Sequence, residues 1–375
     1  MYKVFLVIPP GIESVAKKEV SQLFPELTST NSSDGLEFEC DLETIYRLNL
    51  NLRVPNRILV RFAEFKATSF KELFDNSVRL PWKQFLKKDT SLSIRTTCHK
   101  SKLYHSGAVT QRIHQAIESN LSGKFQLIKN EEAEQIKKQQ LIVVRLSMDN
   151  VTISIDSSGK PLHMRGYREI VSKAPLRENL AASLILSAGW NANQPLMDPF
   201  CGSGTIPIEA ALIAKNQAPG LYRDFAFENW PGFKQNDWQD IRKEQISSTN
   251  TDNSLIFGSD RDLGTITIAK ENARKAKVDS TIIWNQLSIS DVIATGPPGW
   301  IVTNPPYGLR VNTNKDIRNL YARFGEILRE RFSGWEIIFI CNDLKLATQT
   351  KLKLKSLLSF TNGGINVQAF YAKIQ

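Results

Sequence analysis

Residues 196–215, which read LMDPFCGSGTIPIEAALIAK, decide the fold class of this chain. They begin with a short apolar run that predicts a buried strand, and the run from Ile206 to Lys215 predicts a helix. Gly202 and Gly204 lie in the turn between the two, where they let the backbone pass close to a bound molecule. A strand, a glycine-rich turn and a helix in this order are typical of the first unit of a Rossmann-like sheet, so we expect an α/β fold.

The glycine turn differs from the patterns that bind nucleotide phosphates. It lacks the G-x-G-x-x-G spacing of dinucleotide binders and the G-K-[ST] of a P-loop. The acidic residue Asp198 precedes the turn, and a carboxylate suits a cationic or amino-bearing ligand better than a pyrophosphate. S-adenosylmethionine carries both an amino group and a sulfonium, so we expect this cofactor. The residues expected to surround it at the turn are Asp198, Phe200, Gly202, Gly204 and Thr205.

A second strand, from Leu255 to Asp260, also ends in an acid. A carboxylate at that strand end can accept hydrogen bonds from both ribose hydroxyls of an adenosine ligand. The alternative is that Asp260 only caps the helix expected from Leu263 to Ala276. Because the glycine turn precedes it, we interpret Asp260 as a ribose ligand, with Arg261 beside the cofactor.

Residues 300–310 read WIVTNPPYGLR and combine a strand with a proline-rich turn. Two prolines cannot donate to a sheet ladder, so the strand must end at Asn304, at the carboxyl edge where open α/β sheets bind ligands. The amide oxygen of Asn304 and the carbonyl oxygen of Pro305 can each accept one hydrogen of an exocyclic amine, and Tyr307 offers a face for stacking a planar base. The alternative is an ordinary proline-rich turn in which Tyr307 packs as a core aromatic.

The other patterns of the C-terminal half extend this sheet. We expect strands at 281–284, 336–341, 354–360 and 365–373 and a helix at 317–332. The last two strands are joined by a turn at Asn362-Gly363, so they run antiparallel. A parallel sheet with such an ending resembles the class I methyltransferases, and the resemblance implies their fold.

Residues 1–160 alternate short strand and helix patterns. The first sixty residues have the order βαβα, which suggests a ferredoxin-like α+β unit. The expected strands are 4–8, 36–40, 58–65, 91–97, 141–146 and 151–156. The expected helices are 15–24, 42–50, 70–78 and 108–119.

Positive charge is concentrated between Arg61 and Arg112, where there are eleven lysines or arginines and four acidic residues. Lys100 and Lys102 belong to the run CHKSKLYH, residues 98–105, which directly precedes a helix start. Such a set can bind phosphates through the helix N-terminus and the lysines. The alternative is a solvated loop whose lysines only keep the protein soluble.

The run KSKLYHSGAV, residues 100–109, followed by Arg112, is similar to the core of a THUMP domain. THUMP domains are RNA-binding modules of RNA-modifying enzymes. The resemblance implies that Lys100, Lys102 and Arg112 bind RNA.

Residues 159–174 form a linker in which Arg165 and Arg168 lie on either side of Tyr167. We place these two arginines with the RNA-binding residues, and the alternative is a surface hinge. The next run, APLRENLAA at 174–182, starts a helix with proline in its first turn. Three polar residues at this N-terminus can line the cofactor pocket or cap the helix: Arg177, Glu178 and Asn179.

Residues 217–253 interrupt the sheet pattern. They contain Trp230, Trp238 and the polar run Glu244 to Asn253, so we expect part of the segment to be a flexible loop. The tryptophans can stack on RNA, but we favour packing over the sheet edge.

Composition narrows the class of protein. The chain has 375 residues, enough for two or three domains, and its net charge of +10 implies a polyanionic partner such as nucleic acid. Its apolar runs are shorter than the roughly 18 residues of a membrane span. The four cysteines form no C-x-x-C pair, and there are four histidines. We therefore expect no metal site, no membrane contact and a reducing cytoplasm, and we expect a monomer while leaving the oligomeric state open.

Five motifs extend the resemblance over nearly the whole chain: RGYR (165–168), APLRENLAA (174–182), DPFCGSGT (198–205), GSDRD (258–262) and NPPYG (304–308). They resemble the THUMP-containing RNA guanine-N2 methyltransferases, closest to the bacterial large-subunit ribosomal RNA enzymes without a second fused methyltransferase module. The resemblance implies S-adenosylmethionine-dependent methylation of the N2 amine of a guanine in RNA. It also implies a ferredoxin-like domain at 1–60, a THUMP domain at 61–160 and a methyltransferase domain at 161–375.

Two residues depart from this family's pattern. Leu309 replaces an acid that often follows NPPYG, and Ser288 stands where an acid near the adenine is usual, although we keep Ser288 among the cofactor-binding residues. Three alternative functions remain open: a transfer RNA guanine-N2 methyltransferase, a DNA amino-methyltransferase acting on adenine N6 or cytosine N4, and a non-catalytic RNA-binding factor.

Overall fold

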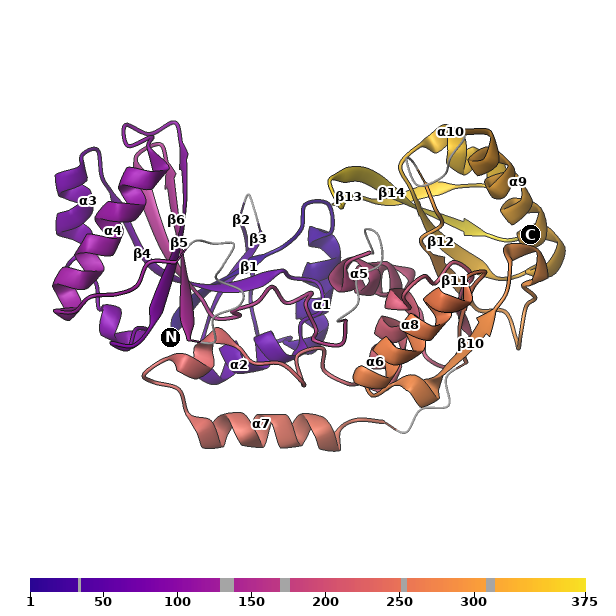
Figure 1. Ribbon diagram of the computed structural model, residues 1–375, viewed down its shortest axis with the longest axis horizontal. Helices are drawn as coiled ribbons and strands as arrows, with labels where there is room; N and C mark the ends of the chain where they lie inside the picture. Colours follow the sequence, from indigo (N-terminus) through magenta and orange to yellow (C-terminus); the bar gives the residue numbers. More distant parts are fainter. Residues whose placement is uncertain (33–34, 129–137, 169–175, 251–254, 308–313) are drawn as a thin grey trace.

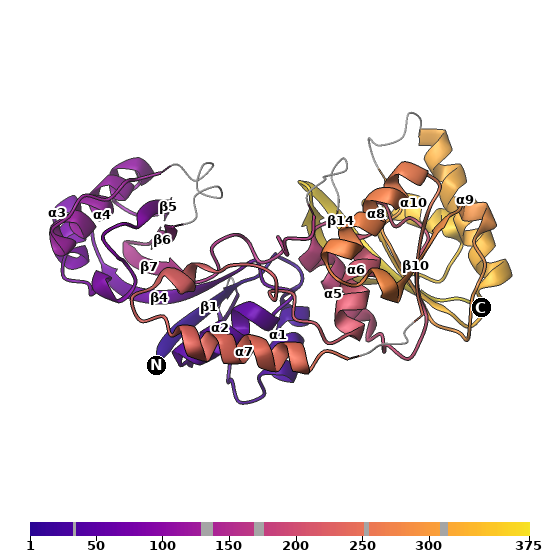
Figure 2. The ribbon, with the colours of Figure 1, turned by 60° about the horizontal axis from the view of Figure 1, so that its bottom comes forward.

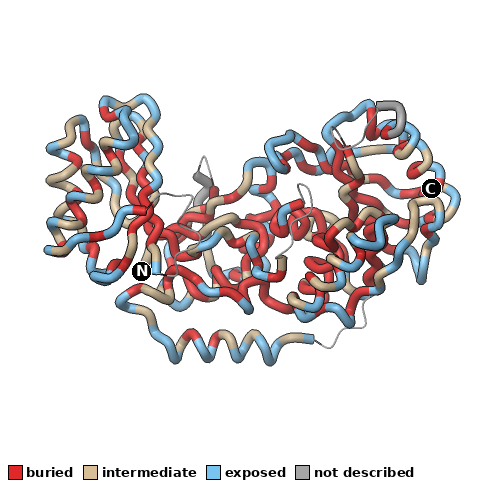
Figure 3. The backbone as a smooth tube through the Cα atoms, viewed as in Figure 1, coloured by how far each residue is buried: buried red, intermediate tan, exposed pale blue. Residues whose placement is uncertain are grey.

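The strands of this protein form two seven-stranded sheets, one in each half of an elongated molecule (Figure 1). The computed structural model describes residues 1–32, 35–128, 138–168, 176–250, 255–307 and 314–375. Buried residues run through both halves and the region between them (Figure 3). The two halves therefore share a hydrophobic interior rather than meeting only at a linker.

The N-terminal sheet has the strand order β2-β3-β1-β4-β7-β6-β5. Its long strand β4 (Arg57–Lys66) joins two parts, because its first residues pair with β1 while its length from Leu59 onward pairs with β7. The proposed domain boundary between residues 60 and 61 falls inside this strand, so the two proposed N-terminal domains share one sheet. The other strands are β1 (Tyr2–Val7), β2 (Thr30–Ser32), β3 (Gly35–Cys40), β5 (Ser91–His99), β6 (Gln139–Ser147) and β7 (Asn150–Asp156).

The alternation of strands and helices expected for residues 1–160 is confirmed, with β2 as an additional strand. Three helices of this half begin at side-chain caps, and two of these caps are short polar residues. Asp41 accepts a hydrogen bond of 2.8 Å from the backbone of Thr44, and Ser69 accepts one of 3.2 Å from the backbone of Glu72. The helices are α1 (Glu13–Leu23), α2 (Leu42–Asn51), α3 (Phe70–Ser77) and α4 (Ser106–Leu121). The last two lie side by side at the outer end of this half (Figures 1 and 2).

The C-terminal sheet has the strand order β10-β9-β8-β11-β12-β14-β13. Its first five strands are parallel, β14 is antiparallel to β12, and β13 is antiparallel to β14. This parallel sheet with an antiparallel end confirms the expected fold class. The strands are β8 (Leu196–Asp198), β9 (Ile256–Asp260), β10 (Ile282–Gln286), β11 (Trp300–Thr303), β12 (Glu336–Cys341), β13 (Lys355–Asn362) and β14 (Ile365–Lys373). The strand order reverses between β8 and β11, and open α/β sheets bind ligands at the carboxyl end of such a reversal.

Helix α6 follows the glycine turn and is buried on almost every side. Nine of its ten residues are buried, including Glu209, because it lies between the C-terminal sheet and the N-terminal half. Helix α5 begins at Glu178, later than expected, and Ala174 and Pro175 lie outside the described residues. The helices of this half are α5 (Glu178–Ala188), α6 (Thr205–Ala214), α8 (Leu263–Lys275), α9 (Asn314–Arg331) and α10 (Leu344–Ala347).

The segment that interrupts the sheet pattern contains a further helix, α7 (Gln235–Ser247), which includes the first residues of the polar run from Glu244. Helix α7 lies along the N-terminal half, beside α2 (Figures 1 and 2). Trp230 is buried and its indole donates a hydrogen bond of 2.8 Å to Gln140 on β6. Trp238 is also buried, and its ring meets Tyr46 of α2 edge to face. Both tryptophans pack, as favoured from the sequence, but on the N-terminal half and not over the edge of the C-terminal sheet.

Arg165 of the linker holds the two halves together. It is 4% exposed, and its guanidinium donates to the carboxylate of Glu209 and to the backbone carbonyls of Leu162 and Arg53. An arginine that is buried with these partners is closed to a phosphate, so the expectation that Arg165 binds RNA does not fit the structure. The linker is therefore buried at Arg165 and does not form a surface hinge there.

Candidate active site

The expected site residues follow the carboxyl ends of neighbouring strands. Asp198 ends β8, Asp260 ends β9, and Asn304 directly follows β11. The hydroxyl of Thr303, the last residue of β11, donates a hydrogen bond of 2.6 Å to Asp198. The backbone N–H of Gly202 donates one of 3.1 Å to Asp260. These two bonds connect the three strand ends into one site.

Asp260 is not the N-cap of the next helix, because another acid takes that position, and its carboxylate accepts hydrogen bonds from the backbone N–H groups of Gly202 and Asp262. Asp262 is the N-cap of α8, where its side chain accepts from the backbone N–H of Thr265. Asp260 is half-buried and holds the glycine turn through Gly202, so the alternative of a helix cap does not apply to it. Its neighbour Arg261 is exposed.

Both glycines of the turn have left-handed backbone conformations, with φ of +52° at Gly202 and +85° at Gly204, but their surroundings differ. A Cβ at Gly202 would meet nothing within 4 Å, so space for a ligand borders this residue. A Cβ at Gly204 would lie 2.7 Å from the ring of Trp284 and 3.0 Å from Ala269. Gly204 is therefore required by packing against β10 and α8.

Asp198 is almost completely enclosed. It is 1% exposed and accepts hydrogen bonds from Thr303 and from the backbone of Phe200. Burial raises the pKa of Asp198 to about 7, although these two hydrogen bonds act in the opposite direction. A cationic group bound nearby would stabilise the ionised carboxylate. The position therefore fits an amino-bearing or sulfonium ligand.

Asn304 presents an acceptor without a donor. Its side-chain oxygen Oδ1 is buried and accepts no hydrogen bond from the described residues. A buried acceptor without a partner is unfavourable by about 1–3 kcal/mol, so such an atom in a site points to a ligand that donates to it. Pro305, which supplies the second expected acceptor, is also buried.

Tyr307 is packed as a core aromatic, which is the alternative that the sequence left open. Its ring is 1% exposed, and its hydroxyl oxygen accepts a hydrogen bond of 2.9 Å from the side-chain amide of Asn362 on β13. In this arrangement the ring has no open face for a base, which argues against the expected stacking role. Leu309, the departure from the family pattern, lies outside the described residues.

Two polar residues at the N-terminus of α5 contact different parts of the protein: Glu178 contacts Arg168, and Asn179 contacts the N-terminal half. Glu178 is buried and lies 3.5 Å from the guanidinium of Arg168, and burial raises the pKa of its carboxyl. Asn179 is buried and its side-chain amide donates to the carbonyl of Val54 and to Asn56 in the N-terminal half, while its side-chain oxygen accepts no hydrogen bond from the described residues. Arg177 is exposed at the N-cap position and its side chain makes no capping bond.

Arg168 lies beside the glycine turn. It donates to the hydroxyl of Thr205, the first residue of α6, and to the carbonyl of Leu176. Since it is also paired with Glu178, the structure places it with the cofactor-binding candidates. The expectation that it contacts RNA does not fit this position.

Asp291 is a candidate site residue that the sequence analysis did not identify. Ser288 follows β10 and donates a hydrogen bond of 2.6 Å to the carboxylate of Asp291, which is exposed. Asp291 therefore supplies an acid beside the position where Ser288 was a departure from the family pattern. The signal was present in the sequence as an acid shortly after the third strand of the sheet.

The families that match this chain cover both halves. The RMKL-like methyltransferase domain matches residues 165–366, the RlmL ferredoxin-like domain matches residues 3–59, and the THUMP domain matches residues 67–156. The chain belongs to the RMKL-like methyltransferase family. The expected class of fold and reaction is thereby confirmed.

Named relatives extend over almost all of this methyltransferase. A Bacillus subtilis protein named "Putative RNA methyltransferase YpsC" is 36% identical over 91% of this chain and 88% of its own length. "Ribosomal RNA large subunit methyltransferase K/L" of Syntrophotalea carbinolica is 32% identical over 97% of this chain. This chain spans only 52% of that K/L protein.

Solved structures of similar sequence have the same fold. A "possible methylase" from Clostridium difficile 630 has a TM-score of 0.89 at 33% identity, covering 100% of this chain and 98% of its own. "SMU.472, a putative methyltransferase complexed with SAH" has a TM-score of 0.88 at 30% identity, with the same coverage. A "predicted N6-adenine-specific DNA methylase" from Listeria monocytogenes has a TM-score of 0.85 at 32% identity, covering 98% and 95%. The expected cofactor of this methyltransferase, S-adenosylmethionine, is confirmed.

The expected phosphate-binding residues lie around the start of α4, in the half opposite the active site (Figure 1). Lys100 and Lys102 are exposed, and Tyr104 beside them is 81% exposed. His105 caps α4 by accepting from the backbone of Ala108. Arg112 is half-buried, with its guanidinium 5.9 Å from the ring of Phe74. The lysines and Tyr104 thus form an open surface, while Arg112 is partly occupied by packing.

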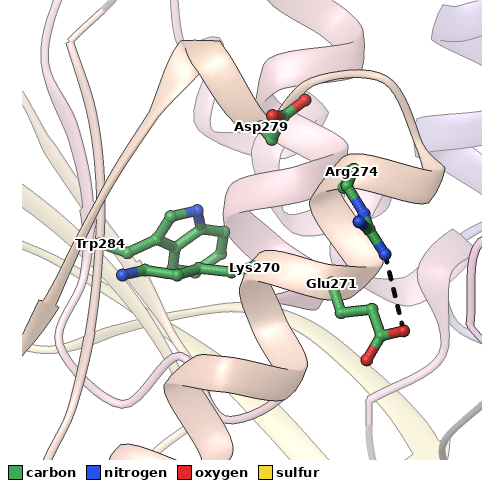
Figure 4. Close-up of a pocket in the computed structure, with 5 residues that line it drawn as sticks. All are labelled: Lys270, Glu271, Arg274, Asp279 and Trp284. Carbon is green, nitrogen blue, oxygen red and sulfur yellow. Dashed lines mark ion pairs between the residues drawn. The ribbon is translucent and has the colours of Figure 1, made fainter.

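A cavity of about 570 Å³ lies against α8 and β10 (Figure 4). It is lined by Lys270, Glu271, Arg274, Asp279 and Trp284. Asp279 precedes β10, so this part of the cavity lies near the amino ends of the strands. Asp260 lies at the carboxyl end of β9. Its position does not match a cofactor site at the carboxyl ends of the strands.

The residues that the structure describes contain no group of three or more histidine, cysteine, aspartate or glutamate side chains arranged to hold a metal ion. None of their helices combines the length and apolar character that crossing a membrane requires.

Proposed function

We propose that this protein transfers a methyl group from S-adenosylmethionine to the exocyclic N2 amine of a guanine in RNA, and that this RNA is large-subunit ribosomal RNA. The observation that carries the proposal is the acceptor Oδ1 of Asn304 at the carboxyl end of β11, which receives no hydrogen bond from any residue that the structure describes. An exocyclic amine can donate to this oxygen. The THUMP domain and the names of the K/L and YpsC relatives support RNA as the substrate.

Asn304 and Pro305 orient the reacting amine. Oδ1 of Asn304 accepts one amine hydrogen and the carbonyl oxygen of Pro305 accepts the other, which favours a pyramidal nitrogen with its lone pair directed away from the base plane. When bound, S-adenosylmethionine supplies an electrophilic methyl group on its sulfonium. The amine nitrogen would bond to this methyl carbon as the carbon–sulfur bond breaks, and the methylated nitrogen would lose a proton to water. This reaction does not need a strong general base.

The cofactor is held by the strand ends and by the linker. We assign the ribose to Asp260, the space beside Gly202 to the cofactor backbone, and the adenine to the neighbourhood of Ser288 and Asp291. The methionine end is assigned to Thr205, with Arg168 and Glu178 beside it. Phe200 is half-buried next to Asp198 and completes the wall of the site.

The RNA phosphates are bound in the N-terminal half, far from the site where the guanine reacts. We assign phosphate contacts to Lys100, Lys102 and Arg112, with Tyr104 as an exposed aromatic that a base can stack on. The target guanine must leave its stack to reach Asn304, which costs a few kcal/mol. Binding of distant phosphates can offset that cost.

The test is to incubate the protein and methyl-labelled cofactor with unmodified large-subunit ribosomal RNA, transfer RNA and double-stranded DNA, and to identify the labelled nucleoside. We expect N2-methylguanosine in the ribosomal RNA at one position. Label in transfer RNA at the same atom would correct the substrate but keep the reaction. Label on adenine N6 or cytosine N4 would overturn the choice of guanine.

Two other functions remain distinguishable by this experiment. A DNA amino-methyltransferase would use the same pair of acceptors, and one similar structure is described as an N6-adenine-specific DNA methylase. A non-catalytic RNA-binding factor would bind RNA without binding the cofactor.

The free cysteines Cys40, Cys98, Cys201 and Cys341 are consistent with our proposal of a cytoplasmic location.

A further inference from the structure

The hydrogen bond between Asn362 and Tyr307 has no role in the reaction described above. It joins the side-chain amide of Asn362 to the Tyr307 hydroxyl at 2.9 Å, and both residues are at most 3% exposed. Asn362 is the last residue of β13, and Gly363 and Gly364 after it have left-handed conformations, which make a tight two-residue turn into β14. The amide is thus presented from a rigid hairpin.

This bond anchors the far end of the reacting loop. The loop starts after Thr303, whose hydroxyl is held by Asp198, and it reaches Tyr307, which is held by Asn362. Asn304 and Pro305 lie between these two anchors. Their acceptor oxygens must be held to within a fraction of an ångström of their productive positions, because small displacements of reacting groups slow a reaction strongly.

The same hairpin touches the ferredoxin-like part of the N-terminal half. A Cβ on Gly11 would lie 1.7 Å from the carbonyl oxygen of Ser359 on β13, so the two backbones are in direct contact. Gly11 has a φ of +93° and follows two prolines, Pro9 and Pro10. Only glycine can occupy this position without displacing β13.

We propose that Asn362 is a positioning residue for the reacting loop, and that the turn at Gly11 braces β13 so that the ferredoxin-like part acts on the methyl transfer step itself. Gly11 contacts the backbone of Ser359, Ser359 lies on the same strand as Asn362, and Asn362 binds Tyr307. This inference rests on the proposed function, because it assigns the loop to catalysis.

The first test is a set of three variants: Asn362→Ala, Tyr307→Phe and both together. Each single change removes the hydrogen bond, and we expect kcat to fall about tenfold or more while the dissociation constant for S-adenosylmethionine stays within about twofold. Because both act through one bond, the double variant should be no slower than the slower single variant. An unchanged kcat, additive losses, or a matching loss of cofactor binding would overturn the positioning role.

The second test is Gly11→Ala, with Gly232→Ala as its control. Gly232 is exposed, and a Cβ there would meet nothing within 4 Å. We expect Gly11→Ala to lower kcat with RNA and cofactor dissociation constants unchanged, and Gly232→Ala to behave as wild type. If Gly11→Ala changes only RNA binding or leaves kcat unchanged, the bracing role is overturned.

These experiments distinguish failure of the positioning role from failure of the proposed function. Wild-type protein that methylates a different amine still allows every ratio of variant to wild type to be measured on that amine. If wild type methylates no RNA or DNA, the proposed function fails, and the coupling is then measured by unfolding of the three variants at positions 307 and 362. Additive changes in the unfolding midpoint would overturn it in that case also.

Discussion

The hydroxyl of Thr303 donates a hydrogen bond of 2.6 Å to the buried carboxylate of Asp198. The two residues are the last ones of β11 and β8, the strands between which the strand order of the sheet reverses. One side of this bond carries the glycine turn that we assign to the cofactor, and the other carries Asn304, which we assign to the amine. If both assignments hold, the bond sets the position of the methyl donor relative to the amine.

Titration of Asp198 should make stability depend on pH. Its pKa is raised to about 7 in the folded protein, above the value of about 3.9 in an unfolded chain. Between these values the folded state binds the additional proton, so stability falls as pH rises, by up to about 1.4 kcal/mol per pH unit. We expect Asp198→Asn, which keeps an acceptor for Thr303, to be more stable than wild type at pH 8 and to lose that advantage at pH 4. Urea unfolding without cofactor across this range measures it, and a difference between the two proteins that is constant with pH would contradict it.

Asn304→Ala should separate binding from turnover. Removing the amide oxygen leaves the cofactor edge intact, so we expect an unchanged dissociation constant for S-adenosylmethionine and a kcat lower by about 10²–10³. Asn304→Asp keeps an acceptor oxygen at the same place and serves as the matched control, with a smaller loss. Equilibrium dialysis and single-turnover methylation measure the two quantities. Wild-type turnover by Asn304→Ala would remove the basis of the proposed function.

The two glycines of the turn should respond differently to alanine. Gly204→Ala forces a Cβ into the ring of Trp284 and a left-handed conformation, so we expect a loss of about 2–4 kcal/mol in unfolding free energy. Gly202→Ala has only the conformational cost of about 1–2 kcal/mol. Because its Cβ enters the space assigned to the cofactor, it should weaken cofactor binding about tenfold or more. Thermal unfolding and cofactor titration compare the pair, and equal effects on both quantities would refute the assignment.

Arg165→Ala should act on folding and not on RNA. The change leaves the Glu209 carboxylate buried without its cation, which is expected to cost about 3–5 kcal/mol. Arg165→Lys provides a milder variant that still carries a charge. We expect both to unfold at lower urea concentration, and the folded fraction to bind RNA with wild-type affinity in a filter assay. A specific loss of RNA binding at full stability would return Arg165 to the RNA surface.

Lys100→Ala and Lys102→Ala should show the opposite pattern. Both side chains are exposed, so stability should be unchanged, while each lost phosphate contact should weaken RNA binding and reduce the slope of log K against log salt by about 1. Lys243→Ala on α7, an exposed lysine paired with Asp240, is the control and should leave binding unchanged. RNA titrations at several salt concentrations measure the slopes. An unaltered slope in the Lys100 and Lys102 variants would favour the solvated loop.

Much of the C-terminal half was predictable because its signals are local. Apolar runs, the glycine turn and the two prolines after Asn304 fix backbone conformation within a few residues. The antiparallel end of the sheet followed from the turn at Asn362-Gly363. Helix α7 was missed because its polar sequence forms a helix only against a partner surface, where Trp238 meets Tyr46 of the N-terminal half.

The sequence by itself determined which chemical groups stand at the ends of the strands and in what order: Asp198, Asp260 and Asn304. Only the tertiary structure decided which polar residues are available. Arg165 is buried by Glu209, forty-four positions away, and Tyr307 is held by Asn362, fifty-five positions away. Asp291 gains its place from the bond to Ser288. The physical reason is that strand ends depend on local stereochemistry, whereas burial and pairing depend on distant segments that meet only when the two halves pack together.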